Sequence, residues 1–353
     1  MPRARSFEFK PGRCAMKAVI LSSKNVVEFS ELPDPQLKGP EDISVQLEAV
    51  SLCETDAKIL DGSIPTKKLP IVIGHEGSGV VVDVGKDVKN TARGDRVLID
   101  PNIYDTTCYA CRDGFSNLCL SGGLMGREVD GVFQQLMIVP SRNVFPLPEN
   151  VPAGIAPLIQ PFSTVVHGHR QVEINPGNVV VVLGLGVVGL MLAQLAKLRG
   201  AKVVGVDIVP AKLELARKLG IDITLNSLEA DPETEVRSLT DGDGADVAIE
   251  AAGVPDLIRN AMQMLKRKGT LLQFGISPKE VTYNMYDAYI KELAIQATRS
   301  SLPQDFEDAI RIVGQGKIDL NYQISKVFKF EEAKEAINFF LDRAKALKVI
   351  IKT

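Results

Sequence analysis

The feature that most constrains this chain is an apolar strand that runs directly into a glycine-rich turn, at residues 178–189 (NVVVVLGLGVVG). Four consecutive valines and a leucine are typical of a strand buried on both faces of a sheet. The next residues, LMLAQLAKLRG, predict a helix that ends at Gly200, and AKVVGVD predicts a second strand that ends at Asp207. Strand, glycine turn, helix, strand and terminal acid is the order that a dinucleotide-binding unit requires.

The turn has the pattern G-x-G-x-x-G, and a glycine is needed at each of the three positions for a different physical reason. Gly184 makes the tight turn, Gly186 lets the backbone approach a pyrophosphate at the helix N-terminus, and Gly189 lets helix and strand pack closely. Asp207 is placed to accept hydrogen bonds from a ribose 2′-hydroxyl. The cofactor-binding residues predicted here are Gly184, Leu185, Gly186, Val187, Val188, Gly189 and Asp207.

The same stretch has two other interpretations. An ordinary strand–helix turn would use the glycines but would not need an acid at the end of the next strand. The apolar run 179–196 also has the length of a membrane span. Its β-branched residues, its glycines and its immediate continuation into a second strand argue against a span, so the nucleotide site is favoured.

Composition narrows the class of protein. The chain has 353 residues, 45% hydrophobic and 24% charged, which predicts a globular protein of about two domains. Its net charge of −3 gives no reason to expect nucleic acid or a membrane surface as a partner. The N-terminus has no long apolar core and is not a convincing secretory signal, so we expect a cytoplasmic protein. Residues 1–15 form an extension of unknown role before a folded part that starts near Met16.

The chain divides into two patterns along its length. Short strands separated by Gly, Pro, Asp and Asn predict an all-β unit up to about residue 145. From residue 178 strands and helices alternate, which predicts a parallel, doubly wound α/β sheet. The tail, ending in ALKVIIK, is expected to return to the first unit. We therefore predict one domain from 1–161 with 298–353 and a dinucleotide-binding domain from 162–297.

Two groups of residues offer metal ligands. Cys53, His75 and Glu76 supply a thiolate, an imidazole and a carboxylate in a chain with only three histidines, a set that suits Zn²⁺ with an open position. Three thiolates lie within one loop, on Cys108, Cys111 and Cys119. Asp105 fits as the fourth ligand of a closed structural site. The alternative for the first group is ordinary core and hydrogen-bonded residues without a metal. The alternative for the second group is three free cysteines on a loop. The five cysteines are an odd number in a chain without a secretory signal, which favours reduced thiols or metal ligands over disulfides.

These motifs together resemble the zinc-dependent medium-chain dehydrogenases, the superfamily of alcohol, polyol and threonine dehydrogenases. The resemblance covers residues 16–353 and rests on CETD, GHEGSGVV, GDRV at 94–97, the cysteine loop, the glycine turn with Asp207, and the closing KALKVIIK. It implies a GroES-like β catalytic domain plus a Rossmann NAD-binding domain, with one catalytic and one structural zinc per chain. Relatives usually have a fourth cysteine where this chain has Asp105. Because oxygen is a harder ligand than sulfur, we expect weaker zinc occupancy there.

A second departure lies at the catalytic site. Polyol and threonine dehydrogenases have Glu-Pro where this chain has Gln160-Pro161. Because Cys53 and Glu76 are both anionic, they would neutralise Zn²⁺ formally without a further charged ligand. The hypothesis is that Cys53, His75 and Glu76 bind directly and that Gln160 only hydrogen-bonds nearby. Loss of the catalytic zinc is the alternative.

The resemblance also assigns roles to single residues. Thr55 matches the hydroxyl that accepts the substrate proton, Lys58 passes it to solvent or is simply exposed, and Asp56 orients the metal histidine. Asp207 repels a 2′-phosphate and so favours NAD over NADP. The resemblance also places Lys212 at the adenosine ribose, and Thr164, Phe274 and Gly275 near the nicotinamide. Arg299 is assigned to substrate hydroxyls or, equally, to the surface or a subunit contact.

The predicted activity is therefore zinc- and NAD-dependent oxidation of a secondary alcohol, a polyol, sugar or amino alcohol, to the ketone. The alternatives are a simple primary or secondary alcohol dehydrogenase, a zinc-free NAD(P)H reductase of enones or quinones, and a non-catalytic NADH-binding protein. Cys53, His75 and Glu76 argue against the zinc-free enzyme. Since this family commonly pairs its Rossmann sheets, a homodimer or homotetramer is expected.

Overall fold

The computed structural model describes residues 15–277, 279–342 and 346–353, and most of the N-terminal extension lies outside this part of the chain. It divides into two compact units, which are described separately. Unit 1 comprises Met1–Gln160 and Asn321–Thr353, and unit 2 comprises Pro161–Leu320. The division at residue 160 differs by one from the predicted boundary, whereas the return to unit 1 comes well after the predicted residue 298.

The later return has a physical cause in the helix Pro303–Gly314 (α9), which is tied to the helix Ile159–Arg170 (α3) of unit 2. Asp305 is fully buried, and its carboxylate accepts a hydrogen bond from His167 Nδ1 at 2.8 Å and pairs with Arg170 Nε at 2.6 Å. This buried charge network holds α9 against α3, so the residues up to 320 stay with unit 2.

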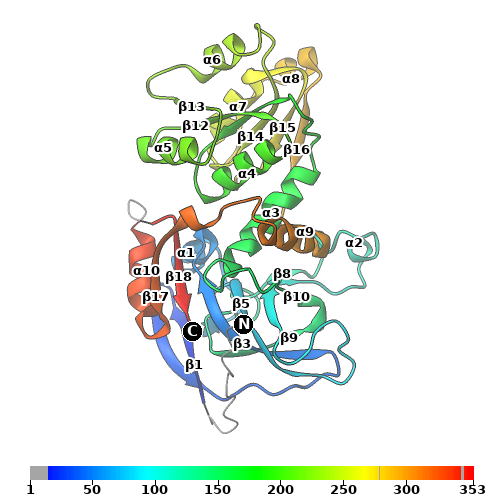
Figure 1. The fold of residues 1–353 in the computed structure, drawn as a ribbon, viewed down its shortest axis with the longest axis vertical. Helices are drawn as coiled ribbons and strands as arrows, with labels where there is room; N and C mark the ends of the chain where they lie inside the picture. Colours follow the sequence, from blue (N-terminus) through cyan, green and yellow to red (C-terminus); the bar gives the residue numbers. More distant parts are fainter. Residues whose placement is uncertain (1–14, 278, 343–345) are drawn as a thin grey trace. The chain divides into compact units, whose positions relative to one another are not determined.

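Unit 2 is built on a six-stranded sheet in which every neighbouring pair is parallel (Figure 1). Its strand order is β13-β12-β11-β14-β15-β16. The bounds are Val179–Leu183 (β11), Lys202–Asp207 (β12), Ile223–Asn226 (β13), Ala245–Glu250 (β14), Leu265–Gln273 (β15) and Ala294–Ala297 (β16). The order reverses direction between β11 and β14, and a doubly wound sheet binds its ligand at such a switch point, beyond the carboxyl ends of the strands. The predicted fold class of this unit is confirmed.

Helices connect these strands and start where the sequence favours a start. Proline occupies the first turn of Pro210–Lys218 (α5), Pro232–Ser238 (α6), Pro255–Met264 (α7) and α9. Its missing N–H costs no hydrogen bond there, because N–H groups of the first turn have no partner within the helix. The remaining helices are Val187–Leu198 (α4) and Met285–Lys291 (α8). Helix α7 ends at Met264, although no proline follows in the next residues, LKRKG. Leu265 is fully buried and pairs with Ala245, so sheet pairing overrides local helix propensity from this residue on.

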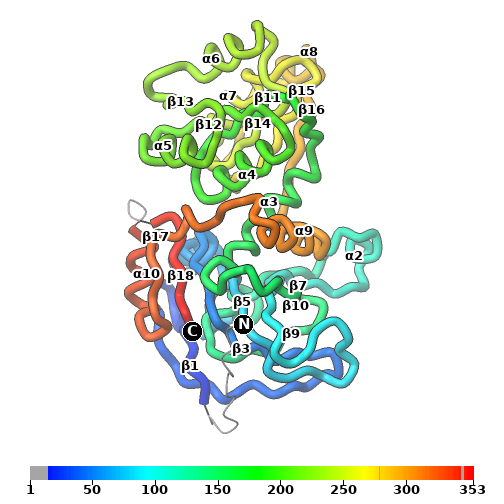
Figure 2. Tube along the Cα trace, viewed as in Figure 1, coloured from blue at the N-terminus to red at the C-terminus, as the bar shows by residue number. Residues whose placement is uncertain are grey.

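Unit 1 is mainly β. Its sheets have the orders β2-β1-β4, β10-β6-β5-β3-β18-β17 with β9 also paired to β3, and β7-β8 (Figure 2). The strands are Met16–Ser23 (β1), Val26–Leu32 (β2), Asp42–Ser51 (β3), Ile71–Val72 (β4), Glu76–Val84 (β5), Arg96–Ile99 (β6), Asn102–Ile103 (β7), Gly123–Leu124 (β8), Leu136–Pro140 (β9), Val144–Pro146 (β10), Ile324–Lys329 (β17) and Lys348–Lys352 (β18). The helices are Glu54–Leu60 (α1), Tyr109–Arg112 (α2) and Ala333–Leu341 (α10).

The last strand closes this unit, as predicted. β18 runs antiparallel to β3 and parallel to β17, and its apolar residues Val349 and Ile351 lie in the same core as β3. In register, Ser51 of β3 is opposite both Glu76 of β5 and Ile350 of β18. The end of β3, the start of β5 and the start of β18 therefore meet at one place.

None of the helices in the described ranges combines the length and the apolar character needed to cross a bilayer.

Candidate functional site

The first predicted metal group comes together where these three strands meet. Cys53 lies two residues after β3 and caps α1, His75 directly precedes β5, and Glu76 is the first residue of β5. One ligand atom from each of the three lies within 4.8 Å of the others. His75 and Glu76 are buried and Cys53 is partly buried. A thiolate, an imidazole and a carboxylate at this separation fit Zn²⁺ with an open position.

Asp56 organises two of these residues from the first turn of α1. One carboxylate oxygen lies 2.9 Å from His75 Nδ1, and the other accepts a hydrogen bond from Cys53 N at 2.8 Å. A proton held between Asp56 and Nδ1 leaves Nε2 as the metal-binding nitrogen. Burial opposes protonation of His75, but the charge and hydrogen bond of Asp56 raise its pKa well above the usual value. A proton therefore competes with a metal for His75, and metal affinity should fall as the pH is lowered.

Glu76 has a partner that the sequence did not reveal. Lys348, the first residue of β18, is 3% exposed, and its Nζ lies 2.5 Å from both Glu76 carboxylate oxygens and 3.1 Å from Leu52 O. Ser51 Oγ also donates to Glu76 Oε2. Burial alone would lower the pKa of Lys348, but the charges of Glu76 and Cys53 raise it, so the lysine stays an ammonium. The closing strand has a lysine at each end, Lys348 and Lys352, and nothing in the sequence distinguished the buried Lys348 from the exposed Lys352.

Two further charges belong to the charge balance of this group. Cys53 and Glu76 alone would neutralise Zn²⁺ formally, but the Lys348 ammonium lies against Glu76 and the Asp56 carboxylate lies against His75. These two added charges are opposite and offset each other. The formal balance with bound Zn²⁺ therefore still needs no charged residue at Gln160.

The other residues predicted for this group lie on two helices. Thr55 and Lys58 are partly exposed residues of α1, and Gln160 is 6% exposed at the start of α3. Their roles stay predictions.

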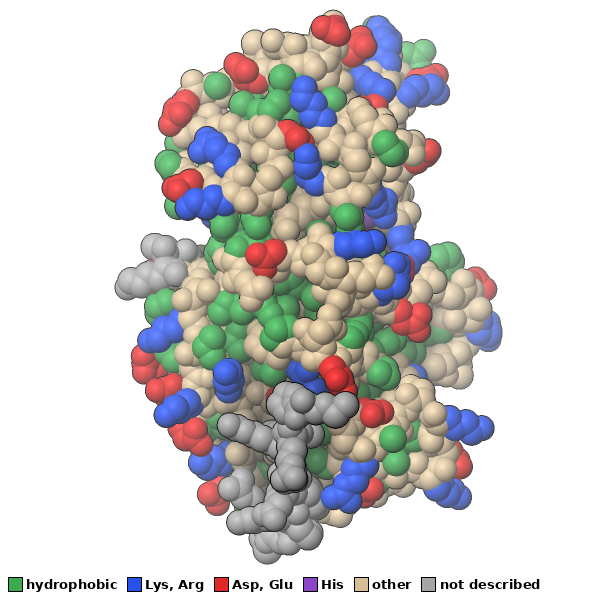
Figure 3. Space-filling model, in the orientation of Figure 1, with side chains coloured by type: hydrophobic (Ala, Val, Ile, Leu, Met, Phe, Trp, Pro, Cys, Tyr) green, Lys and Arg blue, Asp and Glu red, His purple; other side chains and the backbone are tan. Residues whose placement is uncertain are grey.

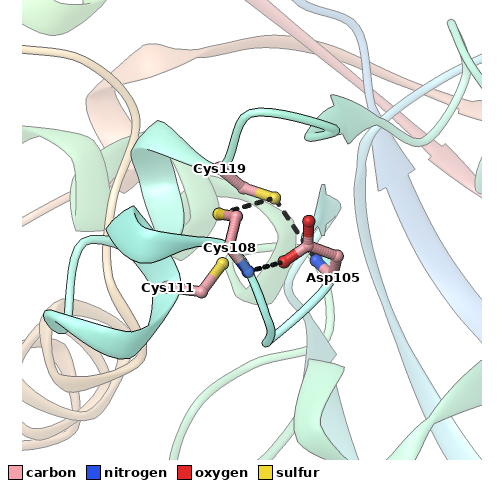
Figure 4. A group of neighbouring side chains, drawn as sticks. All are labelled: Asp105, Cys108, Cys111 and Cys119. Atoms are coloured by element: carbon pink, nitrogen blue, oxygen red, sulfur yellow. Dashed lines mark hydrogen bonds between the residues drawn. The ribbon is translucent and has the colours of Figure 1, made fainter.

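The second predicted group forms a lobe between β7 and β8 (Figure 4). Ligand atoms of Asp105, Cys108, Cys111 and Cys119 all lie within 4.8 Å of one another. Asp105 Oδ1 accepts hydrogen bonds from Thr107 N at 2.8 Å and Cys108 N at 2.9 Å. These are the residues that the spacing predicted, and the geometry fits a closed tetrahedral site.

Ser121, which the sequence analysis missed, fixes the other oxygen of Asp105. Its hydroxyl donates to Asp105 Oδ2 at 2.5 Å. The hydrogen bonds from Cys108 N and Ser121 hold the pKa of Asp105 below its usual range, so the carboxylate stays ionised. An ionised carboxylate is the form that coordinates a cation.

The thiols of the lobe do not ionise alike. Backbone N–H groups of Leu120 and Cys111 lower the pKa of Cys108, whereas desolvation raises the pKa of Cys111 to about 12. Cys111 would therefore need a bound cation before it is deprotonated near neutral pH.

The lobe is anchored by Asp100, which follows β6. Its Oδ1 accepts from Asn102 N at 2.9 Å and from Asn102 Nδ2 at 2.6 Å, while Asn143 Nδ2 donates to the Asp100 carbonyl at 2.9 Å. Burial raises the pKa of Asp100 to about 7. This buried polar cluster fixes the point where the lobe leaves the sheet.

In unit 2 the glycine turn and Asp207 meet as predicted. Asp207 is 8% exposed; its Oδ2 accepts from Leu185 N at 2.8 Å, and its Oδ1 accepts from Ile208 N at 2.8 Å. Lys212 Nζ lies 3.4 Å from Asp207 Oδ2. A Cβ on Gly189 would lie 1.8 Å from Gly184 O, so only glycine at position 189 lets the first turn of α4 pack this closely against the glycine turn. Gly184 itself has φ +92°, which a glycine adopts without strain.

The other predicted cofactor residues lie around the carboxyl ends of the same sheet or on α3. Phe274 and Gly275 directly follow β15, and Thr164 lies in α3 with its hydroxyl donating to Pro161 O at 2.7 Å. Arg299 is exposed, two residues after β16. Their contacts to a cofactor or substrate stay predictions.

Surface charge on the visible face is mixed. Figure 3 shows lysine and arginine side chains interspersed with aspartate and glutamate rather than gathered in a basic stripe.

Comparison with known proteins agrees with both units. Residues 39–149 match the family described as alcohol dehydrogenase GroES-like domain, and residues 187–315 match the family described as zinc-binding dehydrogenase. D-xylulose reductase A of Aspergillus niger is 33% identical over 90% of this chain and 91% of that protein. The chain belongs to the zinc-binding dehydrogenases.

Solved structures of this family have the same fold. A putative zinc-binding dehydrogenase from Sinorhizobium meliloti 1021, bound to NADP, aligns with a TM-score of 0.90 at 30% identity, over 97% of this chain and 100% of that one. Galactitol-1-phosphate dehydrogenase from Escherichia coli aligns with a TM-score of 0.89 at 27% identity, over 96% of this chain and 100% of that one. The predicted GroES-like and Rossmann fold class is confirmed, and the chain is an oxidoreductase.

The lobe gives a direct test of its oxygen ligand. In a Cys53→Ala background, which leaves the lobe as the metal site to follow, Asp105→Ala should release zinc to a chelator at least about tenfold faster. Asp105→Cys should release it more slowly, because a fourth thiolate is the softer ligand. Zinc release would be followed with a colorimetric chelator.

Asp113→Ala is the matched control, since this exposed aspartate lies in the same lobe at the end of α2. It should release zinc at the unchanged rate. An Asp105→Ala rate equal to that of the control would remove Asp105 from the ligand set.

Proposed function

We propose that this zinc-binding dehydrogenase oxidises a secondary alcohol of a polyol, sugar or amino alcohol to the ketone and transfers the hydride to NAD⁺. The observation that carries the proposal is the Cys53–His75–Glu76 group, fixed by Asp56 and Lys348, in a chain whose second unit holds a glycine turn facing a strand-end aspartate. Cys53, His75 and Glu76 would hold the catalytic zinc. Asp105, Cys108, Cys111 and Cys119 would hold the structural one.

Bound zinc supplies Lewis acidity that lowers the pKa of the substrate hydroxyl, and NAD⁺ supplies the hydride acceptor. The protein's own residues hold and move protons. Asp56 keeps a proton on His75 Nδ1, and Lys348 with Ser51 keeps Glu76 in place. Thr55 Oγ1 is proposed to accept the substrate proton, and Lys58, three residues along α1, to pass it toward solvent.

The proposed cofactor is NAD rather than NADP. Asp207 presents a buried carboxylate at the end of β12, and a 2′-phosphate there would meet its negative charge. The next residues, Ile208, Val209 and Pro210, supply no arginine that could pair with a phosphate. NADP bound to the Sinorhizobium meliloti structure is a property of that protein.

The proposed substrate class rests on relatives and on site residues. The similar proteins include a D-xylulose reductase and a galactitol-1-phosphate dehydrogenase, both named for polyol or ketose chemistry. Arg299 and Gln160 are the polar residues proposed to contact substrate hydroxyls.

A homodimer or homotetramer in the cytoplasm completes the proposal. β16 ends the described sheet of unit 2, and α8 next to it leaves Met285, Tyr286 and Tyr289 more than half exposed. A second copy on this edge would cover them.

Metal analysis combined with an NAD⁺-reduction screen tests the function. We expect about two zinc ions per chain and NADH production with polyols, compared with threonine, simple secondary alcohols and primary alcohols. Cys53→Ala should lose turnover and one zinc while keeping the lobe metal. NADH binding without turnover across the whole panel would contradict the proposal and favour a non-catalytic nucleotide-binding protein.

Gln160→Glu tests the ligand set. If Cys53, His75 and Glu76 bind zinc directly, the added carboxylate should change zinc affinity less than about threefold, because the ligand count is already sufficient. The measurement is a competitive zinc titration, with Gln171→Glu, directly after α3, as the control. A gain of tenfold or more for Gln160→Glu alone would show that the native site lacks a ligand.

A further inference from the structure

Glu250 is a fully buried acid that the proposed reaction does not use. It ends β14, where it is paired with Leu183 of β11 on one side and with Gln273 of β15 on the other. Leu183 is followed by the glycine turn, and Gln273 is followed by Phe274 and Gly275. Glu250 therefore lies between the two segments predicted to bind the cofactor.

The side chain of Glu250 holds the loop that follows its own strand. Its Oε1 accepts hydrogen bonds from Ala252 N at 2.8 Å, Gly253 N at 2.8 Å and Val254 N at 3.3 Å. Three donors on one oxygen call for the charge density of a carboxylate. Residues 252–254 therefore have a defined conformation set by one acid.

The backbone of the same residue holds the neighbouring segment. The Glu250 carbonyl accepts from Phe274 N at 2.9 Å and from Gly275 N at 2.9 Å. Together, the side chain and the carbonyl of one residue satisfy five N–H groups from two loops.

The two loops, residues 252–254 and 274–275, are closely packed. A Cβ on Gly184 would lie 2.8 Å from Ala252 Cβ, and a Cβ on Gly275 would lie 2.2 Å from Gly253 N and 2.5 Å from Glu250 Oε2. A shift of residues 252–254 would therefore disturb the segment after β15.

The second carboxylate oxygen of Glu250 is unfavourable for the stability of the folded protein. Oε2 is buried and accepts no hydrogen bond from the described residues, and burial raises the pKa of Glu250 above the usual value. An unsatisfied buried oxygen is unfavourable for stability. Asp207, in contrast, has hydrogen-bond partners on both oxygens.

We propose that Glu250 is a positioning residue for the cofactor: it preorganises residues 252–254 and 274–275 as the surface that receives the nicotinamide half of NAD. This inference rests on the proposed function, because it requires that unit 2 binds the dinucleotide. Glu250 acts through the loops, since its own carboxylate is sealed beneath Gly275.

The test compares Glu250→Met, which keeps the volume but has no acceptor, with Glu250→Gln, which keeps one oxygen. We expect Glu250→Met to weaken NADH binding at least tenfold while AMP, which lacks the nicotinamide half, stays within threefold. Glu250→Gln should stay within threefold for both. Affinities in the full zinc-loaded chain would come from NADH fluorescence and from calorimetry with AMP.

Asp246→Ala is the matched control at the other end of β14. Asp246 Oδ2 accepts from Val179 N at 2.7 Å, and the acid pairs with Lys266. This variant should lower the melting temperature without changing NADH affinity. An equal loss of NADH and AMP binding in Glu250→Met, or unchanged NADH binding, would overturn the proposal.

Amide hydrogen exchange on the unmodified protein provides a second measurement that needs no variant. The N–H groups of Ala252, Gly253 and Val254 should already be protected without NADH. Protection that arises only on NADH binding would overturn preorganisation by Glu250. Failure of the unmodified chain to bind NADH at all would instead refute the proposed function itself.

Discussion

The buried ion pair between Lys348 and Glu76 is the interaction on which unit 1 depends. It joins residues 272 positions apart, the start of the last strand and the start of β5. Charges without a partner are very unfavourable in an apolar interior, so each residue of this pair makes the other possible. The pair ties the chain's closing strand to the residues proposed to bind the catalytic zinc. The position of Glu76 therefore depends on the pairing of the tail strand.

Carboxylates at the start of a helix or the end of a strand hold neighbouring backbone in both units. Asp56 fixes His75 and the Cys53 backbone, Asp207 fixes the glycine turn, and Glu250 fixes the loops beside it. Hydrogen bonds from N–H groups to an ionised or buried carboxylate are stronger than those between neutral groups, so a few acids hold irregular backbone at a defined position. In unit 1 the Lys348 ammonium compensates one of the negative charges around the proposed zinc ligands.

Much of the site could be predicted because many of its residues lie in short, local sequence patterns. The glycine turn with Asp207, the pair His75–Glu76 and the cysteine loop are each contained in one segment, and their side chains come together as expected. Lys348 could not be recognised, since its partner Glu76 is brought to it by strand pairing between distant segments. The role of Glu250 could not be recognised because its carbonyl reaches Phe274 and Gly275 only through the pairing of β14 with β15. The Asp305–His167 contact that ties α9 to α3 is likewise long-range, and no sequence pattern indicated it.

A double-mutant cycle on the ion pair tests the central claim most directly. Urea unfolding of zinc-free Lys348→Met should show a loss of about 3–5 kcal/mol, because Glu76 is left buried and uncompensated. Glu76→Gln should also destabilise the protein, and the double variant Glu76→Gln/Lys348→Met should lose clearly less than the sum of the two single changes. Additive effects in this cycle would mean that the two residues do not depend on each other, and would contradict the account.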